Sequence, residues 1–62
     1  MVEFLPCKHC GWVPNQDRLE KRHDGFGRTP KRITHVCGLT VYRTHWHNLK
    51  RDIADEWNGR MR

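Results

Sequence analysis

The chain has 62 residues, of which 35% are hydrophobic and 31% are charged, and its formal net charge at pH 7 is +5. So short a chain forms one domain at most and buries only about 60% of the surface that its unfolded form exposes. We therefore expect a single domain over residues 1–62, stabilised by a metal, a disulfide or a partner, with no enclosed catalytic pocket and no small-molecule substrate.

The N-terminal residues 1–6 have neither the basic cluster nor the apolar run of a secretory signal peptide. No later stretch approaches the roughly 20 apolar residues that a membrane-spanning helix needs. We therefore expect a soluble protein in the cytoplasm (the host-cell cytoplasm if the protein is viral), with no membrane partner. Thiols stay reduced in that compartment, and an odd number of cysteines also argues against a disulfide framework.

A cysteine turn dominates the N-terminal segment. The motif C-x-x-C-G, which begins at Cys7, places two thiols three residues apart, and its glycine lets the backbone turn beneath them. Pro6 and Pro14 frame the turn, and proline favours extended neighbours. Residues 1–14 therefore predict a short strand, a cysteine turn and an extended exit.

The middle segment, residues 15–32, is polar and basic. Its only large apolar residues are Leu19 and Phe26, and Asp24-Gly25 is a turn signal. We predict a mobile basic loop or hairpin whose cations could follow a phosphate backbone. Its six basic residues are Arg18, Lys21, Arg22, Arg28, Lys31 and Arg32.

The C-terminal half predicts one strand and one helix. Residues 33–36 are rich in β-branched side chains and predict a strand that leads into the third cysteine. Apolar residues then recur at spacings of three, four and four, which is one stripe of a helix over residues 45–58. We take Thr44 as its N-cap and Asn58-Gly59 as its end. The stripe consists of Trp46, Leu49, Ile53 and Trp57.

The cysteines and histidines follow the pattern of a structural zinc site. Zn²⁺ binds four Cys or His ligands in a tetrahedron, and Cys7, Cys10 and Cys37 supply three of them. We therefore predict a small zinc-stabilised α+β fold, in which zinc-ribbon or zinc-knuckle β-hairpin elements precede one C-terminal helix. Metal binding contributes on the order of 10 kcal/mol in small finger peptides, so one structural zinc would be the main source of stability.

The sequence leaves the fourth zinc ligand open between two places. His35 lies two residues before Cys37, so on a strand both side chains leave the same face. His45 and His47 lie at the start of the predicted helix and flank a tryptophan, so only one of them would face the site. If neither place supplies the ligand, a water molecule or one of two histidines that we interpret as surface residues would do so. These two are His9 and His23.

Three separated pieces of the chain share a pattern with one protein family. They read L-P-C-K-H-C-G over residues 5–11, I-T-H-V-C-G over 33–38 and D-I-A-D-E-W-N-G-R over 52–60. Together they resemble the Lar-like family of small phage and prophage proteins, which is named for restriction alleviation. Its members carry two cysteine knuckles and a C-terminal helix that ends in W-N-x-R.

The resemblance implies roles for several residues of this chain. Cys7 and Cys10 would be the first ligand pair, Cys37 would belong to the second pair, and Trp57 would anchor the core beside the zinc. The chain departs from the family pattern at Lys8, which replaces a proline, and in the second pair, which has lost one cysteine.

These observations favour a binding protein over an enzyme. Our first hypothesis is a phage-type accessory protein that binds a host protein; the resemblance implies that it would dampen a type I restriction enzyme or favour its methylation activity. The alternative is a small basic zinc-finger module that binds DNA or RNA through the basic residues of segment 15–32. A zinc-dependent nuclease would need His45 and His47 as a catalytic pair, and the sequence places no acidic partner near them.

Overall fold

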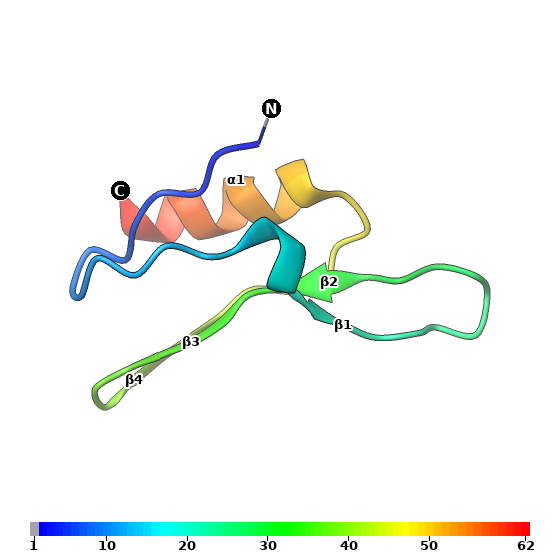
Figure 1. Cartoon of the computed structure of the whole chain (residues 1–62), viewed down its shortest axis with the longest axis horizontal. Coiled ribbons are helices and arrows are strands. Elements are labelled where there is room, and N and C mark those ends of the chain that lie inside the picture. Colours follow the sequence, from blue (N-terminus) through cyan, green and yellow to red (C-terminus); the bar gives the residue numbers. More distant parts are fainter. Residues whose placement is uncertain (1) are drawn as a thin grey trace.

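The structure, a computed structural model, describes residues 2–62, so Met1 of the predicted domain and N-terminal segment lies outside the described residues. Within this part of the chain, two antiparallel β-hairpins precede a single C-terminal helix, which confirms the predicted α+β class (Figure 1). No helix of residues 2–62 is long and apolar enough to cross a membrane. The elements are a 3₁₀ turn η1 (Gln16–Arg18), β1 (Glu20–Lys21), β2 (Lys31–Arg32), β3 (Thr34–Cys37), β4 (Thr40–Arg43) and α1 (Lys50–Met61).

A tight turn sets the register of the β3–β4 hairpin. Only Gly38 and Leu39 lie between the two strands. Gly38 has a φ of +62°, which suits the first central position of a type II′ turn, a position that favours glycine. The resulting register places His35 directly opposite Tyr42. One face of the hairpin therefore brings together side chains that lie seven positions apart in the sequence.

The basic middle segment folds as a second hairpin, with two residues in each strand. Its loop, residues 22–30, extends away from the rest of the molecule at the right of Figure 1. Asp24 orders the loop, because its Oδ1 accepts hydrogen bonds from the amides of Phe26 at 2.7 Å and Arg28 at 3.3 Å. This polar loop thus forms an ordered turn and adds no buried core of its own.

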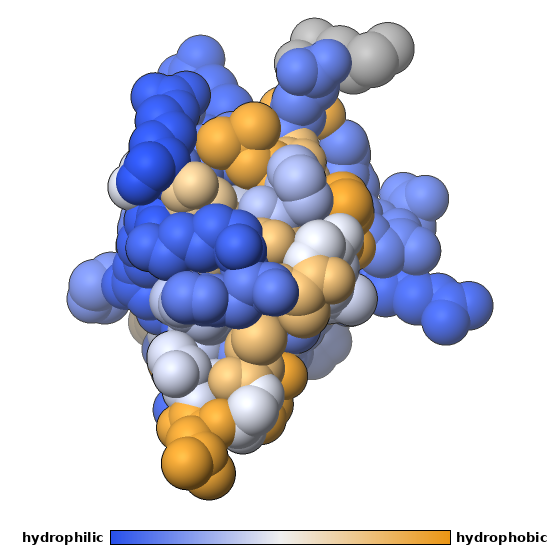
Figure 2. Space-filling view, turned by 90° about the vertical axis from the view of Figure 1, so that its left-hand side faces the viewer, coloured by the Kyte–Doolittle hydropathy of each residue, from blue (hydrophilic) through white to orange (hydrophobic). Residues whose placement is uncertain are grey.

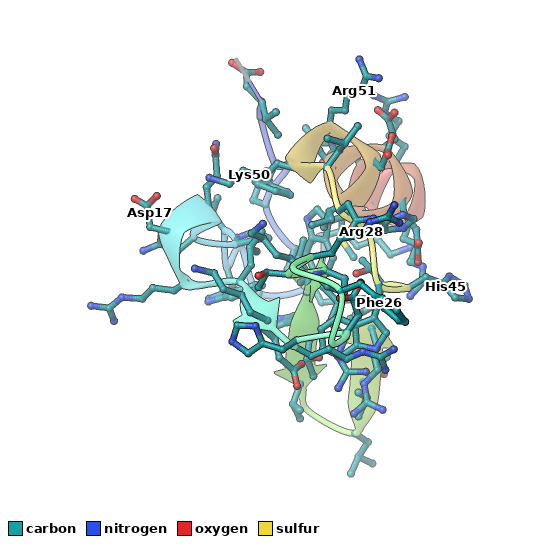
Figure 3. The ribbon with its side chains drawn as sticks, turned by 90° about the vertical axis from the view of Figure 1, so that its right-hand side faces the viewer. Asp17, Phe26, Arg28, His45, Lys50 and Arg51 are labelled. Atoms are coloured by element: carbon teal, nitrogen blue, oxygen red, sulfur yellow. The ribbon has the colours of Figure 1, made fainter. Side chains whose placement is uncertain are left out.

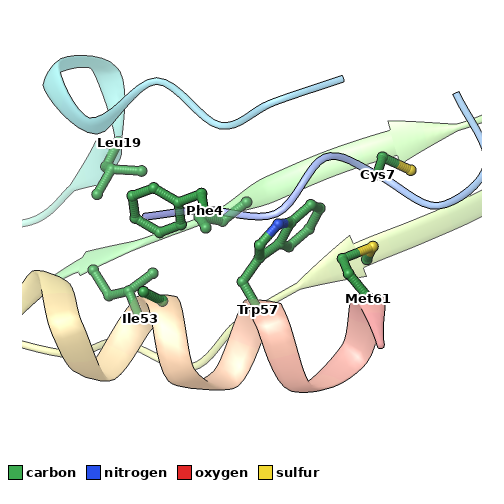
Figure 4. Packing of buried hydrophobic residues seen from close by; sticks show 8 residues of the cluster. Phe4, Cys7, Leu19, Ile53, Trp57 and Met61 are labelled. Atoms are coloured by element: carbon green, nitrogen blue, oxygen red, sulfur yellow. The ribbon is translucent and has the colours of Figure 1, made fainter. Parts of the chain in front are cut away.

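The core lies between α1 and the N-terminal segment (Figure 4). Ile53 and Trp57 of the helix have no exposed surface, and Phe4 and Cys7 pack against them from the other side. The two hairpins each add an aliphatic side chain near their junction. These are Leu19 before β1 and Ile33 between β2 and β3.

The structure contradicts the predicted N-terminal strand, because residues 2–14 form no strand. Side chains of α1, rather than a neighbouring strand, form three of the backbone hydrogen bonds of this segment. Asn58 accepts one from the Leu5 amide at 2.8 Å and donates one to the Glu3 carbonyl at 2.9 Å. The Trp57 indole donates to the Leu5 carbonyl at 2.8 Å. Two adjacent helical residues therefore hold the segment that leads into the first cysteine turn.

The predicted limits of the helix are wrong at both ends. The helix begins at Lys50 rather than at residue 45, and it continues through Asn58-Gly59 to Met61. The late start has a non-local cause. The amides and carbonyls of Lys31 and His47 form two reciprocal hydrogen bonds of 2.8 and 2.9 Å, and this bridge keeps the chain extended beside β2.

Thr44 and Trp46 consequently have roles other than the predicted ones. The Thr44 side chain is buried, and its hydroxyl accepts a hydrogen bond from the Ile33 amide at 3.0 Å instead of capping the helix. Trp46 lies outside the helix, beneath the guanidinium groups of Arg22 and Arg32, which are 5.2 and 4.3 Å from its ring centroid. The buried stripe of α1 omits Leu49, which is 49% exposed, and consists of Ile53, Ala54, Trp57 and Met61.

Replacing Asn58 with alanine is expected to lower the free energy of unfolding by about 1–2 kcal/mol, because two hydrogen bonds to the N-terminal segment are lost. Urea unfolding measures the change. Asn48→Ala is the matched control, since Asn48 is exposed in the connection before α1. Equal losses in the two variants would contradict the anchoring role of Asn58.

Candidate metal centre

Four side chains, two from the first cysteine turn and two from β3, converge at one place. The ligand atoms of Cys7, Cys10, His35 and Cys37 all lie within 4.8 Å of one another. Neighbouring sulfurs around a tetrahedral Zn²⁺ with Zn–S bonds of about 2.3 Å are about 3.8 Å apart, so this spacing fits one ion. Thiolate and imidazole are also the ligands that zinc prefers. The cluster can therefore bind a metal ion.

Backbone hydrogen bonds close the first cysteine turn. The Cys7 amide donates to the Trp12 carbonyl at 2.7 Å, and the Gly11 amide donates to the Cys7 carbonyl at 2.8 Å. Gly11 has a φ of +78°, a backbone conformation that residues with a Cβ rarely adopt. The end of α1 supports the turn, because the Lys8 amide donates to the Met61 sulfur at 3.4 Å. The two thiols of the turn therefore face the same point.

β3 supplies the other two candidate ligands from one face. His35 and Cys37 are the half-buried positions of this strand, and its other two side chains are exposed. His35 Nε2 lies 3.3 Å from Cys10 Sγ, which joins the strand to the first turn. Thr40 pairs with Cys37 across the hairpin and contributes nothing to the cluster.

Aromatic rings surround the His35 imidazole. Trp12 stacks on it with centroids 4.3 Å apart and planes 5° apart. Tyr42 lies nearly parallel at 6.4 Å, and Trp57 meets the ring edge-on at 6.2 Å. Packing of this kind fixes the orientation of a ligating histidine and limits the access of water to the metal.

Two of these aromatic residues, Trp12 and Tyr42, are site residues that sequence reasoning missed. Tyr42 could have been found, since a two-residue turn at Gly38 places it opposite His35. Trp12 carries no such signal, because its position depends on how the first cysteine turn packs against β3.

The thiols of the cluster differ in acidity. Burial raises the pKa of Cys7. Hydrogen bonds from the backbone of His9 and Cys10 and from the side chains of Cys10 and His35 lower it by more, so that the pKa of Cys7 falls to about 6. Burial, followed by hydrogen bonds and negative charge from the two other cysteines, raises the pKa of Cys37 to about 11. Adjacent thiolates disfavour one another, so full ionisation of the cluster requires a cation.

The remaining histidines lie outside the cluster. His45 and His47, the predicted alternatives for the fourth ligand, both face Glu56 of α1, with Nδ1 of His45 at 3.3 Å and Nε2 of His47 at 2.8 Å from one carboxylate oxygen. His9 lies in the first cysteine turn and His23 in the β1–β2 loop, and both are exposed. Of the five histidines, the structure brings only His35 to the cysteines.

Glu56 is the acidic partner that sequence spacing did not place near the two histidines. It also accepts hydrogen bonds from the His45 amide at 3.1 and 3.2 Å and from the Arg60 guanidinium at 2.9 Å. Burial raises the pKa of Glu56, but the hydrogen bonds from His47 and His45 and the charge of Arg60 lower it overall, so the carboxylate stays ionised at neutral pH. The arrangement ties the β4–α1 connection to the helix.

The basic residues of the middle segment do not gather at one point. Arg32 forms a bidentate ion pair with Glu20, with N···O distances of 2.7 and 3.0 Å. Arg22 lies with Arg32 over Trp46, and the Lys31 ammonium donates to the Thr29 carbonyl at 3.4 Å. The three other cations are exposed on η1, β1 and the loop; they are Arg18, Lys21 and Arg28.

We expect Cys37→Ser and His35→Ala to reduce the zinc content from one ion per chain to nearly none and to unfold the protein, since metal binding contributes on the order of 10 kcal/mol. His45→Ala and His47→Ala should keep the zinc. Elemental analysis of protein purified without added metal, together with Co²⁺ absorption as a probe of thiolate ligation, measures the difference. Zinc retention by His35→Ala with loss in His45→Ala or His47→Ala would refute this cluster as the site.

Zinc binding is expected to release at least one proton per ion at pH 7, because the Cys37 thiol has a pKa of about 11 and must ionise to ligate. Affinity should fall as the pH drops, most steeply below about 6, where Cys7 is protonated as well. Calorimetry in two buffers of different ionisation enthalpy counts the protons. Zinc binding at pH 7 without proton release would contradict this expectation.

Known proteins add no constraint on this centre. Comparisons of the chain with protein-family models, with curated proteins and with solved structures find no match. The resemblance to the Lar-like family therefore stays a prediction, and the function rests on the geometry of the chain itself.

Proposed function

We propose that this chain is a zinc-stabilised binding module in which one structural Zn²⁺ joins the first cysteine turn to the β3–β4 hairpin. The convergence of four protein ligands carries this proposal. Four such ligands complete a tetrahedron and leave no open position for a substrate, which is the arrangement of structural rather than catalytic zinc sites. The metal would replace the large core that a chain of 62 residues cannot form.

In this proposal the module binds another protein through the exposed face of the β3–β4 hairpin. The face opposite the metal ligands carries Val36 and Val41, which are 64% and 55% exposed, and Leu39 in the turn is fully exposed. Figure 2 shows apolar side chains at the lower end of the molecule, where this hairpin projects. Contiguous exposed aliphatic side chains are typical of protein-binding surfaces.

The proposed partner is a type I restriction enzyme of a host cell, whose action the chain would dampen or shift towards methylation. This part of the proposal follows from the resemblance to the Lar-like family. The three resembling segments include the parts of the chain that build the centre, namely the first cysteine turn, β3 with its glycine turn, and the end of α1 that carries Trp57 and Asn58. Because the resembling segments build the metal centre, we infer that a phage-type protein of this kind would use the zinc to hold the β3–β4 hairpin rigid for binding.

Expression of the chain in a host with an active type I restriction system is expected to raise the plating efficiency of unmodified phage. Leu39→Asp should abolish the effect, because loss of a central interface side chain costs about 2 kcal/mol or more, roughly thirtyfold in affinity. Phe26→Ser is the matched control, since Phe26 is an exposed apolar residue on the other hairpin.

Zinc content verifies that each variant in this assay is folded. No gain in plating efficiency with the unaltered chain would contradict the restriction part of the proposal. Full activity of Leu39→Asp would instead contradict the β3–β4 face as the docking surface.

A second candidate function, binding of single-stranded DNA or RNA, is favoured by the tip of the β1–β2 loop. Phe26 is 87% exposed there and lies between Gly25 and Gly27, whose φ angles are +84° and +79°. Figure 3 shows Phe26 and Arg28 on this loop, at the end of the molecule that faces the viewer. An exposed aromatic ring beside cations can stack on a base while the cations neutralise phosphates, and such binding weakens steeply as salt rises.

A further inference from the structure

A cleft of about 630 Å³ lies where η1 and the β1–β2 hairpin meet the chain that leaves the first cysteine turn. Its volume is within the range of about 300–1,000 Å³ that is common for small-ligand sites. None of the four candidate metal ligands lines it, but Trp12 does, and Trp12 stacks on His35. The cleft is therefore a separate site that borders the metal centre.

One side of the cleft is apolar. Trp12 is 40% exposed although one of its faces packs on His35, so part of the indole is available to a ligand. Val13 beside it is 53% exposed, and Leu19 closes this side as a buried side chain. A planar ring suits this side of the cleft, because stacking on the exposed part of the indole buries apolar surface of both groups.

The polar side of the cleft favours an anion over a cation. The Glu20 carboxylate accepts hydrogen bonds from Arg32 at 2.7 and 3.0 Å and from the Thr34 hydroxyl at 2.9 Å, so its charge is already compensated. Arg18 is exposed on η1 and enters none of the ion pairs found within residues 2–62. An anionic group attached to the ring would meet the Arg18 guanidinium at the edge of the cleft.

We propose that this cleft binds a nucleobase with its adjacent phosphate, the base stacked at Trp12 and the phosphate held by Arg18. The inference rests on the second candidate function, and it gives that function a specific base-binding site away from Phe26. Lys21 and Arg28 are further exposed cations on the β1–β2 hairpin, and a strand with several phosphates could use them.

The Glu20 carboxylate adds a preference among the bases. An ionised carboxylate offers about four acceptor positions, and Arg32 and Thr34 occupy three of them. The remaining position can accept a hydrogen bond from an exocyclic amino group. We therefore expect bases that carry an amino group, such as adenine, to bind more tightly than thymine or uracil.

The zinc-loaded full chain is titrated with adenosine 5′-monophosphate, with ribose 5-phosphate and with short single-stranded oligo(dA) and oligo(dT). The readouts are the indole N–H resonances of the tryptophans, with that of Trp12 assigned by its loss in Trp12→Phe, and the anisotropy of labelled oligonucleotides. We expect the adenine-bearing probes to shift the Trp12 resonance and ribose 5-phosphate to leave it unchanged. The resonance of Trp57, which is buried, should not move.

Two variants test the contacts separately. Trp12→Leu should weaken oligo(dA) binding by about 5- to 150-fold, the effect of losing one base–aromatic stack. Because Trp12 also packs on His35, zinc content is measured for this variant. Arg18→Ala should weaken binding about tenfold without disturbing the core. Arg51→Ala, which removes an equal charge from an exposed position on α1, is its control.

The outcomes separate this inference from the function on which it rests. In one outcome, oligonucleotides bind without shifting the Trp12 resonance, and Arg18→Ala and Arg51→Ala have the same affinity for them. This outcome overturns the cleft as the binding site but retains the second candidate function. A Trp12 shift with adenosine 5′-monophosphate but no binding of oligonucleotides supports the cleft as a site for free nucleotides and removes the single-strand function. No shift of Trp12 with any adenine-bearing probe overturns the cleft.

Discussion

The constraint on which this structure depends is the crowding of three thiols and an imidazole within 4.8 Å. Such a cluster cannot carry several negative charges unless a cation compensates them, since adjacent thiolates disfavour one another. With a metal ion in place, the first cysteine turn becomes joined to β3, and the long chain segment between Cys10 and Cys37 is closed into a loop. A core as small as that of a 62-residue chain usually needs such a junction to hold two hairpins and a helix together.

The packing around the cluster extends this constraint to the rest of the molecule. Trp57 meets the His35 ring edge-on and also holds the N-terminal segment through its indole N–H. Asn58 holds the same segment through two further hydrogen bonds. The helix therefore holds the segment that leads into the cysteine turn, and a metal ion in the cluster would join that turn to β3.

Two of the three proposed interaction surfaces, the exposed face of β3–β4 and the β1–β2 loop, lie at different ends of the molecule. The exposed face of β3–β4 is on the hairpin that supplies two candidate ligands, so the zinc centre would determine its orientation directly. The basic β1–β2 loop extends from the opposite side (Figure 1), and Asp24 rather than the metal orders its tip. Protein binding and nucleic-acid binding are consequently separable by substitutions at Leu39 on the one hand and at Phe26 or Arg18 on the other.

Several features could be predicted because they depend on residues close together in the chain. The C-x-x-C-G motif specifies a turn with both thiols on one side, and the i, i+2 spacing of His35 and Cys37 specifies one face of a strand. The order of hairpins before a C-terminal helix also followed from local patterns. The helix start was missed because the bridge between Lys31 and His47 joins residues that no local pattern relates.

The sequence by itself determined which residues can ligate a metal, the fold class and the net charge, since composition and short spacings decide these. Only the tertiary structure decided that His35 rather than His45 or His47 lies with the three cysteines, and that the other two meet Glu56. The cleft at Trp12 is likewise tertiary, because residues 12–20 and 32–34, two separate stretches of the chain, line it together. The physical reason is the same in each case. Contacts between distant segments depend on how turns and strands pack, and packing is set by hydrogen bonds and buried surfaces that short-range sequence spacing does not encode.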